Sequence, residues 1–89
     1  MIRYFYRFTG RVQGVGFRWT ARTLADSLGL TGWVSNEWDG SVTMELQGDE
    51  ERITRMVNAL QGGRYIEIEN MERKKIWPLE HESSFQVRH

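Results

Sequence analysis

The sequence lacks cysteine altogether and has only two histidines, His81 and His89, among its 89 residues. The absence of cysteine excludes a disulfide scaffold, a thiolate nucleophile and every cysteine-ligated zinc or iron–sulfur site. Two histidines leave little material for a histidine-based metal site. His81 stands among charged and hydroxyl residues, which is typical of a solvated loop. These shortages favour a metal-free, non-covalent chemistry.

Net charge is also missing, because 12 Lys and Arg residues balance 12 Asp and Glu residues. A general polyanion binder needs a basic surplus, so any positive surface must be local. No apolar run approaches the ~20 residues of a membrane-spanning helix, and the alternating N-terminus does not resemble a signal peptide. We therefore expect a cytoplasmic protein without a nucleic-acid or membrane partner. Nothing in the sequence demands a second chain, so a monomer is expected.

Hydrophobic spacing divides the chain into strand-like and helix-like segments. Apolar residues alternate over residues 2–9, which predicts a strand ended by Gly10. Stripes with three-four spacing predict a helix over 17–28 and a second one that starts around 48–51 and closes at Gly62-Gly63. Further strands are predicted at about 30–36, 41–47 and 65–71, with a short one at 85–87. The Asp39-Gly40 pair predicts a hairpin between the first two of these.

The predicted order of elements is strand, helix, strand, strand, helix, strand. This is the split βαβ order of the ferredoxin-like fold. Each helix has one apolar stripe, so both should cover one face of an antiparallel sheet in an α+β sandwich. Residues 85–87 leave room for a short extra strand at the C-terminus. No linker, repeat or low-complexity tract interrupts residues 1–89, which predicts a single domain.

A glycine-rich loop, residues 10–18, connects the first predicted strand to the first predicted helix. Gly14 and Gly16 allow a tight turn and a close approach of the backbone to another group. No Ser, Thr, Asp or Asn stands at positions 14–17 to cap the helix, so its free N–H groups favour an anion. Arg18 can add two parallel hydrogen bonds to a phosphate or carboxylate. The spacing matches neither a Walker loop nor a dinucleotide fingerprint, and a plain tight turn remains an alternative.

Asn36 is expected to lie at the mouth of this loop. The first strand, first helix and second strand form a parallel crossover, so both strands end at the same edge of the sheet. An arginine, backbone donors and an amide would then converge on a small concavity. This set favours direct attack by a water molecule that the site orients, with stabilisation of the developing charge.

The sequence resembles the acylphosphatase family over essentially its whole length. The resemblance rests on residues 10–18, residues 28–36 and Asp39-Gly40. It implies a ferredoxin-like fold and hydrolysis of the carboxyl–phosphate bond of acyl phosphates, without metal or cofactor. It also implies that Arg18 binds the phosphoryl group and that Asn36 orients the attacking water. The amides that complete the cradle would be those of Gly14, Val15, Gly16, Phe17 and Arg18.

The implied partners are a small acyl phosphate as substrate and inorganic phosphate as product or competitive ligand. Ser35 is expected to reduce the positive potential beside the site, and the bulky Trp38 to narrow its mouth. RNA-recognition modules share the order of elements, but residues 41–46 lack their aromatic pattern. Two hypotheses of different class remain: an acyl-phosphate hydrolase, and a non-catalytic module of the same fold that binds an anion, a nucleic acid or a protein.

Overall fold

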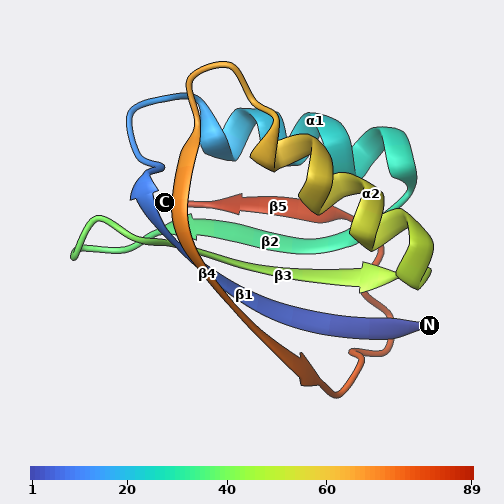
Figure 1. The fold of residues 1–89 in the computed structure, drawn as a ribbon. Helices are drawn as coiled ribbons and strands as arrows, with labels where there is room; N and C mark the ends of the chain where they lie inside the picture. Colours follow the sequence, from blue (N-terminus) through green and yellow to red (C-terminus); the bar gives the residue numbers. More distant parts are fainter.

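Two helices cover one face of a five-stranded sheet in the computed structural model, which describes residues 1–89 (Figure 1). The order of the strands across the sheet is β4-β1-β3-β2-β5. The predicted α+β, ferredoxin-like βαββαβ sandwich is confirmed. The elements are β1 (Ile2–Arg11), α1 (Phe17–Leu28), β2 (Thr31–Asn36), β3 (Val42–Gly48), α2 (Glu50–Gln61), β4 (Glu67–Ile76) and β5 (Phe85–Arg88).

The sheet is mixed because its last strand runs parallel to its neighbour. β1 pairs antiparallel with β3 and β4, and β2 pairs antiparallel with β3, as expected. β5 pairs parallel with β2, and Val34 lies opposite Val87. The sequence predicted this short strand but not its partner. The pairing places β5 beneath α1, and the C-terminal residues reach the end of the sheet where β2 ends (Figure 1).

Two strands, β1 and β4, differ by more than one residue from their predicted bounds. β1 does not end at Gly10 but continues to Arg11, through a shift of register against β4 between Thr9 and Gly10. Such a bulge lets a strand accommodate an unpaired residue and continue. β4 begins two residues later than predicted and ends at Ile76 rather than Met71. Most of its side chains are exposed, so the apolar alternation that marks a strand is absent.

The core lies between the helices and the sheet, and it fixes the start of α1. Tyr6 and Phe8 of β1 are buried, and their rings stack with centroids 5.7 Å apart. The Phe8 ring also lies 5.1 Å from that of Phe17, the first residue of α1. Ala21 and Ala25 are fully buried, and their small side chains let α1 approach the sheet closely. Neither helix is long and apolar enough to cross a membrane.

On the other face of the sheet, a buried arginine attaches the segment 77–84 to β1 and β3. Arg3 Nε donates to Glu45 Oε1 at 2.7 Å, and its two terminal nitrogens donate to the two oxygens of Glu82 at 2.7 and 3.2 Å. Gln47 adds two hydrogen bonds to the backbone of Leu79. The segment therefore packs as a cover over this end of the sheet.

Candidate functional site

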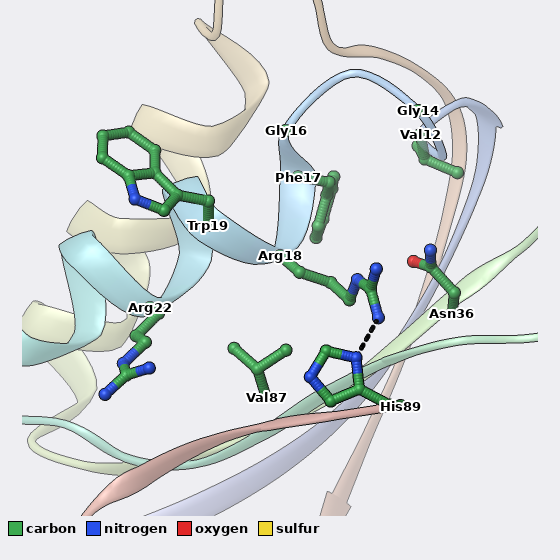
Figure 2. Close-up of a pocket in the computed structure, with 10 residues that line it drawn as sticks. All are labelled: Val12, Gly14, Gly16, Phe17, Arg18, Trp19, Arg22, Asn36, Val87 and His89. Carbon is green, nitrogen blue, oxygen red and sulfur yellow. Dashed lines mark hydrogen bonds between the residues drawn. The ribbon is translucent and has the colours of Figure 1, made fainter.

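A cavity of about 400 Å³ opens at the edge of the sheet where β1 and β2 end. Phe8 and Asn36 both pair with Val42 of the intervening β3, so the ends of β1 and β2 lie close together. Figure 2 shows the residues that line the cavity, which come from the loop, α1, β2 and the end of the chain. They are Val12, Gly14, Gly16, Phe17, Arg18, Trp19, Arg22, Asn36, Val87 and His89.

The loop between β1 and α1 presents backbone donors to this cavity. Gly14 and Gly16 have φ values of 72° and 79°, in the left-handed region that favours glycine. Gly16 caps α1 without a side-chain hydrogen bond, and the first intrahelical bond runs from the Thr20 N–H to the Gly16 carbonyl. The N–H groups of Phe17, Arg18 and Trp19 therefore have no acceptor within the helix. Together with the positive end of the helix dipole, these groups suit an anion.

The Arg18 side chain crosses the cavity towards β2 and the C-terminal residues (Figure 2). Its Nη1 donates to the Arg88 carbonyl oxygen at 3.3 Å and lies 3.3 Å from His89 Nδ1. The imidazole nitrogen can accept this hydrogen bond only when it carries no proton. The contacts with β5 hold one side of the guanidinium and leave Nη2 available for a ligand.

Asn36 supplies the one buried side-chain oxygen or nitrogen in the protein that has no hydrogen-bond partner, its Oδ1. An unsatisfied buried acceptor costs about 1–3 kcal/mol, so native structures rarely leave one unpaired. Figure 2 shows this oxygen directed towards the Arg18 guanidinium across the cavity. The site thus combines several donors suited to an anion with one unpaired acceptor, Asn36 Oδ1, suited to a water molecule.

Gln13 fixes the loop relative to Asn36. Its Nε2 donates to the carbonyl oxygens of Glu37 and Ser41 at 2.7 and 2.9 Å. Both carbonyls belong to the turn that follows Asn36. In the same turn, Asp39 accepts hydrogen bonds from the hydroxyl and the backbone N–H of Ser41, and these bonds, aided by Arg7, hold the pKa of Asp39 below its usual value. The turn therefore fixes the position of the loop between β1 and α1 relative to Asn36 at the end of β2.

Comparison with known proteins identifies the family. Residues 4–87 match the acylphosphatase family model. The chain belongs to the acylphosphatase family. A curated acylphosphatase of Clostridium acetobutylicum is 39% identical over 88 residues, which cover 98% of this chain and 97% of the relative. The crystal structure of acylphosphatase from Bacillus subtilis superposes with a TM-score of 0.92 at 32% identity, covering all of both chains.

An acylphosphatase structure from Coxiella burnetii superposes with a TM-score of 0.87 at 33% identity, covering 98% of this chain and 92% of that one. These likenesses make the chain an acylphosphatase enzyme, a hydrolase with a small acyl phosphate as substrate. Of the two hypotheses left open by the sequence, the enzyme is confirmed. The side chains include no group of three or more His, Cys, Asp or Glu residues that could hold a metal ion.

Most of the residues singled out in the sequence of this acylphosphatase meet at the cavity. Gly14, Gly16, Phe17, Arg18 and Asn36 all line it. Val15 does not line this cavity: it lines a neighbouring hollow of about 530 Å³, and it packs, partly buried, against the core.

The expectation that Trp38 narrows the mouth is wrong. Trp38 is 98% exposed and does not line the cavity, because its side chain points to solvent from the tip of the turn that Gln13 holds. His81 lies in an exposed loop, as predicted.

The lining residues that were not singled out from the sequence are Val12, Trp19, Arg22, Val87 and His89. Arg22 follows Arg18 by four positions on a predicted helix, a spacing that places both on one face, so this signal was available. Val87 and His89 are two residues apart at the end of the chain, and they reach the cavity only because β5 pairs with β2. A strand of four residues carries too little pattern to reveal its partner.

Proposed function

We propose that this acylphosphatase hydrolyses the carboxyl–phosphate bond in the cavity at the ends of β1 and β2, by direct attack of one positioned water. The observation that carries the proposal is the buried Asn36 Oδ1, which has no hydrogen-bond partner and faces the Arg18 guanidinium. We also propose a monomer as the active form, because the loop, α1, β2 and the C-terminal residues of one chain complete the lining of the cavity.

Arg18 and the backbone amides from Gly14 to Arg18 bind the phosphoryl oxygens. Arg18 brings the positive charge and, once β5 holds its Nη1, can direct Nη2 at the phosphoryl group. The amides of Gly14, Val15, Gly16, Phe17 and Arg18 complete the cradle at the open start of α1. Donors fixed before the reaction stabilise charge on a transferred phosphoryl group without reorganising, which is the main term in such catalysis.

Asn36 positions the nucleophile. Its Oδ1 accepts a hydrogen bond from the water and thereby turns a water lone pair towards phosphorus. The new water oxygen–phosphorus bond forms while the bond from phosphorus to the acyl oxygen breaks, and that electron pair leaves on the carboxylate. A carboxylate is a weakly basic leaving group, so no strong general acid is required. No Asp or Glu side chain lines the cavity, and the proton of the water passes to a phosphoryl oxygen.

Hydrolysis of benzoyl phosphate by the purified chain, with a chelator present, tests the proposal. Arg18→Gln should lower kcat/KM by about 10²–10³-fold and weaken competitive inhibition by inorganic phosphate, because it removes a donor to the transition state. Asn36→Ala should lower kcat by about 10²–10³-fold while the inhibition constant of phosphate changes by less than about threefold. Arg55→Gln on α2 and Asn70→Ala on β4 are matched controls that should behave as the wild type.

Two outcomes would refute these assignments. The mechanism fails if the chelated wild type shows no turnover above that of buffer. The division of roles fails if a folded Asn36→Ala protein loses phosphate affinity as strongly as Arg18→Gln does.

A further inference from the structure

The cavity extends well beyond the space that a phosphoryl group needs. A phosphoryl group with its bridging oxygen has five heavy atoms, comparable to a few water molecules of about 30 Å³ each. The cavity of about 400 Å³ continues from Arg18 along the groove between α1 and β5. In Figure 2 Val87 lies between Arg18 and Arg22. The groove therefore has room for the acyl half of a substrate.

Arg22 stands at the far end of this groove. It lies four residues after Arg18 on the same face of α1, about 6 Å further along the helix axis. Its side chain is 62% exposed, and its nearest carboxylate, Asp26 Oδ2, is 3.9 Å from Nε. An exposed pair at this distance is weak and leaves the guanidinium free to bind another anion.

Charge and polarity change along the groove in a defined order. Arg18 occupies one end, the apolar Val87 lies along it, and Arg22 occupies the other end. None of the ten lining residues has an acidic side chain, although the chain as a whole has as many acidic as basic residues. Two cations separated by an apolar stretch match a ligand with an anion at each end.

We propose that the acyl group of the preferred substrate carries a second anionic group, a carboxylate or a phosphate, which Arg22 binds at the outer end of the groove. This inference rests on the proposed function, because it requires the phosphoryl group to lie at Arg18. Arginine binds both anions through two parallel hydrogen bonds. The substrate class is then the acyl phosphates of dicarboxylic or phosphorylated carboxylic acids, with the two anions separated by a short apolar spacer.

Substituted benzoyl phosphates test this specificity. Substrates with a 3-carboxy or a 3-phosphonomethyl group are compared with 3-methylbenzoyl phosphate, which is similar in shape to the first but uncharged on the ring. We expect the wild type to show a KM about two to five times lower for at least one charged substrate, as a partly exposed charge pair provides. The two charged substrates distinguish a carboxylate site from a phosphate site. The preference should shrink at high salt because the pair is exposed.

Variants of Arg22 assign the preference to its side chain. Arg22→Gln should bring the KM for the preferred charged substrate close to the KM for 3-methylbenzoyl phosphate. Arg22→Glu should make the KM for the charged substrate the higher of the two. Circular dichroism confirms the fold of both variants. Arg55→Gln, an equal loss of charge on α2, should keep the wild-type ratio. Equal KM values in the wild type, or a preference that survives in Arg22→Gln, would overturn the inference and leave the proposed function standing. Hydrolysis of none of these substrates would overturn both.

Discussion

At the scale of single residues, Gly16 meets two separate demands, because its backbone is left-handed and its missing side chain leaves the cradle open. A Cβ at this position would meet no atom within 4 Å, so Gly16→Ala should fold without a clash. With φ at 79°, alanine should still lower the free energy of unfolding by about 1–2 kcal/mol. The added methyl group stands beside the free N–H groups, and the inhibition constant of phosphate should rise several-fold. Urea unfolding and inhibition kinetics measure the two effects.

Gly40 offers a matched control for the backbone effect. It also has a positive φ, 92°, and open space around the position of a Cβ, but it lies at the tip of the hairpin outside the cavity. Gly40→Ala should lose similar stability and keep the phosphate affinity of the wild type. An equal change of phosphate affinity in both variants would contradict the cradle assigned to Gly16.

The residues that could be predicted from the sequence are those whose position follows from local rules or from topology. Glycine spacing and the missing cap marked Gly14, Gly16 and Arg18, and the handedness of the crossover brought Asn36 to the same edge. The contact between Arg18 and His89 could not be predicted, since it depends on which edge of the sheet the last strand joins. Gln13 belonged to the recognised loop, but its hydrogen bonds to the turn require the folded hairpin.

At the scale of elements, Arg3 connects β1 and β3 to the segment 77–84. Burial alone would lower the pKa of Arg3, but the hydrogen bonds and charges of Glu82 and Glu45 outweigh it and raise the pKa. Arg3→Met should lower the free energy of unfolding by about 3–5 kcal/mol, because it leaves two carboxylates at a buried site without their cation. Adding Glu82→Gln should recover part of that loss. Urea titration of the single and double variants measures both.

The same variants separate stability from activity. Arg3 lies at the beginning of β1, and the cavity lies at its end, so kcat/KM of the folded Arg3→Met protein should match that of the wild type. A loss of stability below 1 kcal/mol would show that the segment 77–84 is not held by this arginine.

Elements with one buried face were the ones that the sequence predicted well. Both helices have a single apolar stripe and begin and end close to the predicted residues. β4 was predicted too short because it is an exposed edge strand whose charged residues show no apolar alternation. Charged residues of this kind protect the edge of a sheet from pairing with other chains, and they hide the strand from a reading based on hydrophobicity.

At the scale of the whole molecule, the shifted pKa values set the pH range of stability. Burial raises the pKa of Tyr6 to about 12, and a hydrogen bond to Glu50 raises that of Tyr4. The folded state then holds these protons more tightly than the unfolded state, whose tyrosines have a pKa near 10.0. Stability should therefore be complete below pH 10 and fall as the pH rises towards 12.

At acidic pH the shift has the opposite direction, because the folded state lowers the pKa of Glu82. Burial would raise the pKa of Glu82, but hydrogen bonds from Arg3 and Thr31 and the charge of Arg3 hold it below its usual value of 4.5. The unfolded state then binds the proton more tightly, so this stability is present above pH 4.5 and lost as the pH falls further.

Urea unfolding across the pH range tests both sides. Tyr6→Phe should move the alkaline loss of stability to higher pH, and Tyr65→Phe, at an exposed ring, should leave it in place. Glu82→Gln should flatten the acidic loss. An alkaline limb that is identical in Tyr6→Phe and the wild type would contradict the part assigned to Tyr6.

The contact between Arg18 and the Arg88 carbonyl joins positions 70 residues apart. It requires β5 to dock on β2, β2 on β3 and β3 on β1, so the guanidinium takes its place only when nearly every strand has its partner. Contacts between such distant positions form slowly, whereas a helix is complete within its own few turns. Turnover therefore reports that the whole sheet has assembled. A chain with both helices formed and β5 undocked would show helical circular dichroism but would not bind phosphate through Arg18.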